Sequence, residues 1–243
     1  MKKTEHATTT FRQLIAKGTV MMPGVPNAAM ARQVERAGFD AVYVSGAGMA
    51  NATAGVPDIG LLTLIEVVHL AGYVAKAVNI PAIVDVEEMV GRIKAAVAAR
   101  RDPNFMIIAR TDARAVEDFD RAVERAGEYL AAGADAIFPE ALQSADEFRD
   151  FAKEIDRPLL ANMTEFGKSP LLSVKQLSDF GYRMVIFPMS AFRVAMKASE
   201  AFFRGLKKTG IQSDWLDKMQ TRQELYDLLD YDPAAEEWSG FRD

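Results

Sequence analysis

The sequence predicts one α/β domain, a TIM-type β/α barrel that takes up the whole chain, residues 1–243. The chain has 243 residues, and such a barrel typically needs about 250. Seven near-continuous apolar runs recur at helix-plus-strand spacing, which is typical of parallel strands buried on both faces. A helix pattern, a glycine and the next strand repeat as one unit at residues 27–41, 125–136 and 177–184, without an obvious linker.

The predicted strands end at residues that a catalytic site could use. They cover residues 20–24, 42–46, 83–85, 106–112, 137–140, 159–165 and 184–188. In a β/α barrel the catalytic side chains lie at the C-terminal ends of the strands. Polar residues at several of these ends therefore predict an enzyme site on that face.

Composition excludes several other classes of protein. The net charge of −5 comes from interspersed acids and bases, and without a Lys/Arg stripe a nucleic-acid partner is not expected. The absence of Cys excludes disulfides, a Cys-rich zinc site and a cysteine nucleophile. Neither a signal-peptide core nor an apolar run of about 20 residues is present, so we expect a cytoplasmic protein without a membrane partner.

One predicted connection is too short. The strand at residues 83–85 is followed, after Val86, directly by a helix pattern at residues 87–100. Strand-to-helix loops commonly take about 2–6 residues, and a closed barrel of this type has eight strands. Seven βα units and a missing loop together predict that material is absent between Asp85 and Glu87.

Seven motifs carry a family resemblance. They are YVSGAG (43–48), GVPDIG (55–60), ARTDA (109–113), FPEA (138–141), NMTEFG (162–167), SAFR (190–193) and MQTR (219–222). In this order, from about Phe11 to Tyr231, they resemble the isocitrate lyase and phosphoenolpyruvate mutase superfamily. Within it they look most like the methylisocitrate lyases. Seven motifs in sequence are far more specific than any one of them.

The resemblance implies a function and an assembly. The implied reaction is retro-aldol cleavage of a tricarboxylate into pyruvate and succinate, with Mg²⁺ stabilising the enolate. The implied substrate is a small di- or tricarboxylate, and the implied assembly is a homo-oligomer, a tetramer. A C-terminal helical segment, residues 213–229, is expected to pack on a neighbouring subunit.

The resemblance also names what is absent. Members of the family have a second metal-binding Asp, a further helix–strand unit and a Lys-Lys-Cys-Gly-His loop after the third strand. The Cys of that loop is the implied acid/base. This chain lacks all of them, at the place where the connection is too short.

The metal-site candidates follow the third strand. Asp85 ends that strand and suits Mg²⁺, which prefers carboxylate and water oxygens; its alternative is a helix cap. Glu87 is a second candidate because i and i+2 share a strand face, although the pattern favours a helix N-terminus stabilised through the dipole. Asp58, acting through a water, is a third, and it would also suit a turn.

The candidates for the substrate pocket lie at later strand ends. Arg110 can hold a carboxylate through two parallel hydrogen bonds, or it can form a structural ion pair with Asp112 or Glu140. Glu140 can orient substrate hydroxyls or metal waters, or simply pack at the barrel mouth. Asn162 and Thr164 alternate along one strand end and can donate to a carboxylate, or form an ordinary turn.

Six further residues are candidates. Ser45, Gly46 and Ala47 form a small-residue strand end whose backbone N–H groups could approach an anion, or they are only a turn. By resemblance, Tyr43 belongs to the catalytic pocket with Arg110 and Glu140. Arg193 and Arg222 match positions of further carboxylate contacts, although surface arginines on late helices are common.

Three functions remain open from the sequence. The first is a methylisocitrate lyase-like carbon–carbon lyase, with very low activity expected of the chain as it stands. The second is a catalytically silent relative that binds small carboxylates. The third is another chemistry of the superfamily, acting on oxaloacetate or a phosphonate.

Overall fold

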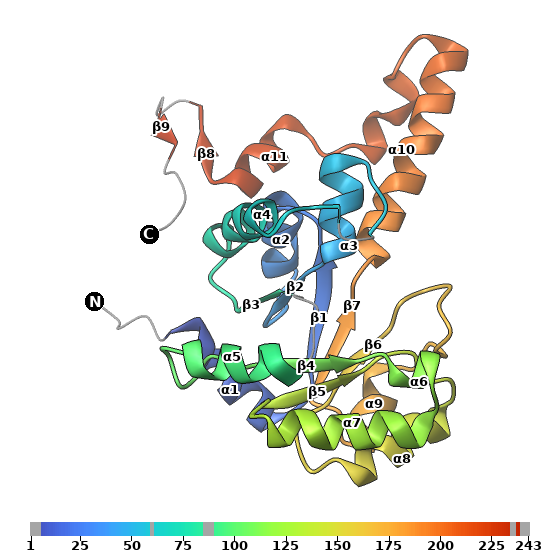
Figure 1. Ribbon diagram of the computed structural model, residues 1–243. Helices are drawn as coiled ribbons and strands as arrows, with labels where there is room; N and C mark the ends of the chain where they lie inside the picture. Colours follow the sequence, from blue (N-terminus) through green and yellow to red (C-terminus); the bar gives the residue numbers. More distant parts are fainter. Residues whose placement is uncertain (1–5, 59–60, 85–89, 234–236, 239–243) are drawn as a thin grey trace.

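The computed structural model describes residues 6–58, 61–84, 90–233 and 237–238. Seven parallel strands form a curled sheet with helices on its outside (Figure 1). They are β1 (Val20–Val25), β2 (Val42–Val44), β3 (Ala82–Val84), β4 (Ile108–Thr111), β5 (Ala136–Pro139), β6 (Leu160–Asn162) and β7 (Met184–Phe187). The predicted fold class and seven strands are confirmed.

The strand order shows where the curled sheet is open. Five strands pair in the order β3-β2-β1-β7-β6, and β4 pairs with β5. A parallel bridge between Ile137 and Leu159 joins β5 to β6. Within the described residues β3 pairs only with β2, and β4 only with β5. The sheet is therefore a half-barrel, and we call the gap between β3 and β4 the open seam.

Helices follow the strands as the repeated glycine phrase predicts. The first half of the chain holds α1 (Ala7–Lys17), α2 (Ala28–Arg36), α3 (Gly46–Met49), the π-helical turn η1 (Ala50–Ala54), α4 (Leu64–Ala77) and α5 (Val90–Ala99). The second half holds α6 (Ala113–Val116), α7 (Phe119–Ala131), α8 (Ala145–Glu154), α9 (Val174–Phe180), α10 (Ser190–Thr209), the 3₁₀ turn η2 (Ser213–Lys218) and α11 (Arg222–Leu229). A short antiparallel pair, β8 (Tyr231–Asp232) and β9 (Glu237–Trp238), follows.

Glycine ends the helices at the predicted places. Gly38, Gly133 and Gly181 have φ angles of 84°, 105° and 103°, in the region that residues with a Cβ rarely adopt. At each of them the chain leaves a helix and enters the next strand. The repeated phrase in the sequence is thus a set of helix C-termini.

The core has an interior layer and two outer layers. Inside the half-barrel, residues such as Met22, Leu160 and Ile186 pack together, and Phe11 of α1 closes the N-terminal end. One outer layer lies between β4–β6 and helices α7–α9, and the other lies between β1–β2 and helices α2 and α4. The polar ends of the strands are therefore held by a continuous apolar framework.

The helix after β3 packs on the far side of the open seam. In a regular barrel this helix would lie beside α4, but α5 contacts α7 instead. Ile65, Val68 and Tyr73 of α4 are 69%, 58% and 53% exposed. Within the described residues, the connection that is too short in the sequence thus lies where β3 pairs on one edge alone and α4 exposes an apolar face.

The N-terminal end of the seam is held by Asp135, just before β5. Its carboxylate accepts hydrogen bonds from Arg12 of α1 (3.1 Å) and Arg100 at the end of α5 (2.9 Å). It also accepts one from the backbone N–H of Ile107 (2.9 Å). We call this group the Asp135 clasp.

The C-terminal segment extends away from the half-barrel along α10 (Figure 1). Leu228 of α11 is buried, and Arg32 of α2 donates to the Leu228 carbonyl at 3.3 Å. Arg32 also pairs with Asp230 at 2.5 Å. The end of the segment thus contacts α2 of its own chain, and packing of residues 213–229 on a neighbouring subunit stays a prediction. None of the described helices is both long enough and apolar enough to span a bilayer.

Candidate active site

Four of the predicted site residues form a chain of polar contacts at the ends of three neighbouring strands. An Arg110 nitrogen (β4) lies 3.6 Å from a Glu140 oxygen just after β5. The Asn162 side chain, at the end of β6, donates to Glu140 at 3.2 Å. Thr164 donates to the Asn162 amide oxygen at 2.8 Å. We call this chain of four residues the polar network.

The guanidinium of Arg110 is held on two sides. It donates two hydrogen bonds, of 3.1 and 2.9 Å, to the carboxylate of Asp112. Its carbon lies 5.2 Å from the centre of the Phe138 ring, close enough for a cation–π contact. The Arg110 side chain is 28% exposed and that of Asp112 is 52% exposed. Because Asp112 is so exposed, its pairing with Arg110 is weak and easily exchanged for another carboxylate.

Glu140 is placed by the backbone on either side of it. Its N–H donates to the Thr111 carbonyl at 2.9 Å, which extends the contact between β4 and β5 by one residue. Ala141 then turns the chain with φ 59°, and its N–H donates to Glu140 Oε1 at 3.2 Å. The Glu140 side chain is 21% exposed. The carboxylate is therefore fixed beside Arg110 and Asn162.

Charge decides what this network can bind. Two carboxylates, Asp112 and Glu140, surround one guanidinium, so the group carries one net negative charge when all three ionise. A ligand carboxylate can replace Asp112 on the fork of Arg110. A cation beside Glu140 would make that exchange more favourable by removing charge repulsion.

A second polar cluster follows β6. Arg193 of α10 donates to the backbone oxygen of Glu165 at 2.9 Å and to its carboxylate at 2.6 Å. Ser190 donates to the same carboxylate, and Arg193 lies over the Phe166 ring at 5.4 Å. Burial alone would raise the pKa of Glu165, but the hydrogen bonds from Ser190 and Arg193 lower it overall. Arg193 is thus anchored beside Thr164, one residue from the polar network.

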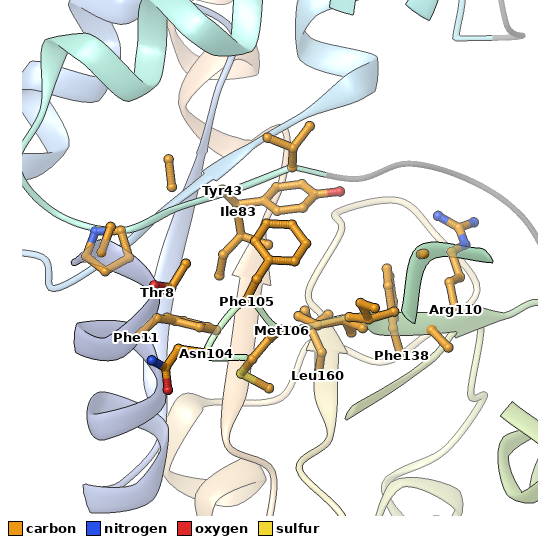
Figure 2. A pocket seen from close by; sticks show the side chains of 18 of the residues that line it. Thr8, Phe11, Tyr43, Ile83, Asn104, Phe105, Met106, Arg110, Phe138 and Leu160 are labelled. Carbon is orange, nitrogen blue, oxygen red and sulfur yellow. The ribbon is translucent and has the colours of Figure 1, made fainter. Parts of the chain in front are cut away.

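The residues after β2 have local structural roles. Ser45 is buried, and its hydroxyl accepts from the Gly48 N–H at 3.0 Å, which caps α3. Gly46 and Ala47 form the first turn of that helix. Tyr43 is a core residue inside the half-barrel, 6% exposed. It lines the same cavity as Arg110, but it lies on the opposite wall (Figure 2).

Two other predicted positions among the described residues, Arg222 and Asp58, are not brought to the polar network. Arg222 is the first residue of α11, on the C-terminal segment, and is exposed. Asp58 lies exposed in the loop after η1. The metal candidates Asp85 and Glu87 lie outside the described residues. Within residues 6–58, 61–84, 90–233 and 237–238, no three His, Asp or Glu residues are grouped so as to hold a metal ion.

The half-barrel encloses a cavity of about 480 Å³ that opens at the seam (Figure 2). Its walls are mostly apolar and come from both sides of the seam, with Ile83 and Tyr43 on one side and Met106, Ile108 and Phe138 on the other. Arg110 lies at one end. The cavity therefore meets the polar network at the C-terminal ends of the strands.

Sequence reasoning missed two features of this site. Asp112 was expected only as an alternative partner of Arg110, and it proves to accept from both Nε and Nη2, one edge of the guanidinium; the Arg-x-Asp spacing on one predicted strand was the available signal. Glu165 and Ser190 lay inside the quoted motifs without a role. The contacts of Ser190 and Arg193 with Glu165 join residues 25 and 28 apart in the sequence, and no local pattern shows them.

The curled parallel sheet is that of a β/α-barrel enzyme, and the chain belongs to the phosphoenolpyruvate mutase and isocitrate lyase superfamily. The sequence model described as "Phosphoenolpyruvate phosphomutase" matches residues 11–88 and 82–207. Similar curated proteins are named 2-methylisocitrate lyase. That of Aeropyrum pernix is 43% identical, with 91% of this chain and 86% of the relative covered. That of Escherichia coli is 35% identical, with 91% of each covered.

Solved structures of the superfamily agree with the fold. A trigonal crystal form of 2,3-dimethylmalate lyase superposes with a TM-score of 0.87 and 28% identity, and 95% of this chain and 94% of that chain are covered. Phosphonopyruvate hydrolase in complex with oxalate and Mg²⁺ gives a TM-score of 0.84 at 23% identity, covering 92% of this chain and 95% of that one. At that identity the second likeness concerns the fold alone.

The alignments also show where this chain is short. The family model matches in two pieces that meet at residues 82–88, between β3 and α5. The alignment with the Aeropyrum pernix protein has 269 positions but covers only 91% of 243 residues, or about 221. About 48 positions of that alignment thus have no counterpart here. This agrees with the absent material predicted between Asp85 and Glu87.

Proposed function

We propose that the chain is a methylisocitrate lyase-like carbon–carbon lyase that holds a small di- or tricarboxylate at the polar network. The single observation that supports this best is the contact chain from Arg110 through Glu140 and Asn162 to Thr164. It places a carboxylate-binding fork, a fixed acceptor and two amide or hydroxyl donors on one face of the half-barrel.

Each residue of the network has a role in this proposal. Arg110 exchanges Asp112 for a substrate carboxylate and keeps it in a planar, two-bond contact. Glu140 accepts a hydrogen bond from the substrate hydroxyl and holds that proton. Asn162 and Thr164 donate to a second carboxylate. In the Ser45–Ala47 turn, Gly46 and Ala47 contribute backbone N–H groups, while the Ser45 N–H donates to the Val25 carbonyl at 3.3 Å and holds the turn in place. Tyr43 closes the pocket, and Arg193 and Arg222 contact carboxylates further out.

Mg²⁺ belongs to the proposal through the superfamily, not through the described residues. When bound, it would stabilise the enolate that forms at the pyruvate half. The described acids do not form a complete shell for it, and Asp85 with Glu87, and Asp58 through a water, remain its proposed ligands. No role assigned above depends on the ion.

The chain alone is proposed to bind its substrate but turn it over very slowly. The sequence has no Cys, and the polar network contains no evident acid to protonate a departing succinate carbanion. General acid–base catalysis contributes about 10²–10⁴-fold to a rate. Because the segment is absent, a carboxylate-binding relative without activity is the second candidate function.

Similarity favours this chemistry over the other reactions of the superfamily. Relatives that are 35–43% identical carry the name 2-methylisocitrate lyase. The structures of oxaloacetate acetylhydrolase are 23–24% identical and share the fold alone. A homotetramer in the cytoplasm completes the proposal.

Binding of succinate to the Arg110→Lys variant tests it. Lysine keeps the charge but loses the fork, so calorimetry should show at least about tenfold weaker binding, or about 1.4 kcal/mol. Arg204→Lys is the matched control, because the Arg204 side chain on α10 is 77% exposed. Equal affinities for succinate in both variants would remove the polar network from the substrate site.

A further inference from the structure

The open seam has two strand edges without a partner in the part of the chain that the structure describes. β3 uses one edge to pair with β2, and β4 uses one edge to pair with β5. Both strands belong to one series of parallel pairings that runs from β3 through β2, β1, β7, β6 and β5 to β4. Strand edges of this kind are templates for pairing with another segment.

The space between the edges has the chemistry of a strand that is buried on both faces. Ala82, Ile83 and Val84 line the cavity from β3, and Ile108 and Ala109 line it from β4. Phe105 and Leu160 also line this cavity of about 480 Å³. A four-residue strand would be about 13 Å long, which matches the three and four residues of β3 and β4.

The layer outside the seam is equally without cover. α4 contacts β3 and α2, and its exposed apolar face carries Ile65 and Val68. A strand placed in the seam would therefore meet the apolar cavity on one face and the apolar helix layer on the other. Such a strand needs an uninterrupted apolar sequence, as in parallel sheets, not an alternating one.

Two independent observations place a strand here. The edges and the cavity come from the geometry of this chain, whereas the roughly 48 unmatched positions come from its alignment, whose break at residues 82–88 lies beside β3. That length is more than one strand and one helix require. The cavity is thus the place of a whole strand, not a packing defect of one or two side chains.

We propose that the open seam binds an extended, uninterrupted apolar segment of another polypeptide as an eighth strand, parallel to β3 and β4. Its N–H and C=O groups continue the two hydrogen-bond ladders, and its side chains fill the cavity. Its C-terminal end lies next to Arg110. The proposal is independent of the proposed function, because it concerns the side and middle of the half-barrel and not the polar network.

A capped peptide, acetyl-Lys-Val-Ile-Val-Val-Lys-amide, is a direct probe. The matched control has the same side chains but carries N-methyl groups on its two central residues. Successive N–H groups of a strand point to opposite neighbours, so this change removes one bond to β3 and one to β4. Calorimetry with the full chain should give at least tenfold weaker binding of the methylated peptide.

Two protein variants locate the binding. Phe105→Asp puts a charge at the cavity rim, where the side chain is 55% exposed and folding should tolerate it. Leu171→Asp makes the same change at a 65% exposed position away from the cavity. Phe105→Asp should lower the affinity for the unmethylated peptide at least fivefold, and Leu171→Asp less than twofold. Hydrogen exchange should slow at residues 82–84 and 108–111 when the peptide binds.

Several results would overturn the proposal. Equal affinity of the two peptides would mean that the cavity takes any apolar molecule and does not add a strand. Strong protection of both β3 and β4 amides in the free protein would mean that the seam is already paired. A dimer that forms with rising concentration and excludes the peptide would mean that a second copy fills the seam. Absence of binding by the unmethylated peptide would also refute it.

Discussion

The two sides of the open seam differ in what their polar strand ends do. At the ends of β4, β5 and β6, polar side chains contact one another across strands, as Arg110, Glu140 and Asn162 do. At the end of β2, the buried hydroxyl of Ser45 caps α3 and donates to the thioether sulfur of Met189, after β7, at 3.7 Å. A polar residue at a strand end is therefore not by itself a site residue. Contacts between the polar side chains of different strands distinguish the two cases.

The largest expected effect comes from restoring the segment that is absent after β3. Insertion of the family's missing segment between Val86 and Glu87 should raise lyase turnover by about 10²–10⁴-fold, because it returns a general acid. Production of pyruvate from methylisocitrate with Mg²⁺ present is the assay. A Gly/Ser insert of equal length is the control. Equally fast turnover by the unmodified 243-residue chain would contradict this and would point to a different acid.

Two alanine variants test the difference between the two sides of the open seam at single residues. Ser45→Ala removes the cap of α3 and should lower the free energy of unfolding by about 1 kcal/mol, while its backbone N–H and the affinity for succinate remain. Asn162→Ala removes the link between Glu140 and Thr164. It should weaken the binding of succinate about tenfold, which corresponds to about 1.4 kcal/mol. Urea unfolding and calorimetry on both variants are the measurements. The same pattern in both variants would abolish the distinction between the two sides.

These outcomes depend on features that the sequence shows to different degrees. The strands and the glycine helix ends follow from local patterns, and the structure confirms them. The break after Asp85 follows from loop length, and the match of the family model in two pieces agrees with it. The position of Arg222 does not follow from any local pattern. The position of Arg222 depends on how α11 packs on α2, and this packing includes the contact between Arg32 and Asp230, which are 198 residues apart. Contacts at such separations leave no periodic signal in the chain.

Asp112→Asn addresses competition within the polar network. The amide cannot replace the carboxylate in a charge-assisted pair, so Arg110 becomes more available to a ligand carboxylate. Succinate affinity should rise roughly two- to fivefold, in keeping with the modest strength of exposed ion pairs. Asp179→Asn is the control, since that carboxylate is 59% exposed and forms a surface ion pair with Lys175. A loss of affinity in Asp112→Asn would show that Asp112 supports binding.

The smallest expected effect concerns the loops that follow β4 and β5, on the side of the open seam that carries the polar network. Arg114 after β4 donates two hydrogen bonds, of 3.0 and 2.8 Å, to Glu147 of α8, and Gln143 after β5 donates its N–H to the same carboxylate. The Arg114 bonds, together with the Gln143 bond, lower the pKa of Glu147 against the opposing effect of burial. A lowered pKa in the folded state stabilises the protein at neutral pH, and this contribution is lost as the pH falls through the folded value.

The free energy of unfolding should therefore fall less steeply with acidification in Glu147→Gln than in the parent chain. Denaturant unfolding at a series of pH values from neutral downward measures this. Asp146→Asn is the neighbouring control, because the Asp146 side chain is 73% exposed. Identical slopes in the parent chain and Glu147→Gln would show that the pair does not tie the two loops together.

The Asp135 clasp has a consequence for the order in which the chain folds. Arg12 and Asp135 are 123 residues apart, and Thr8 of the same helix donates to Asp102, 94 residues away, at 2.6 Å. Closing such long loops costs entropy before any contact repays it. During synthesis α1 emerges well before the groups that Arg12 contacts, which are the carbonyls of Pro103 and Asn104 and the carboxylate of Asp135. The contacts of this early helix are thus complete only when the chain beyond residue 135 has left the ribosome.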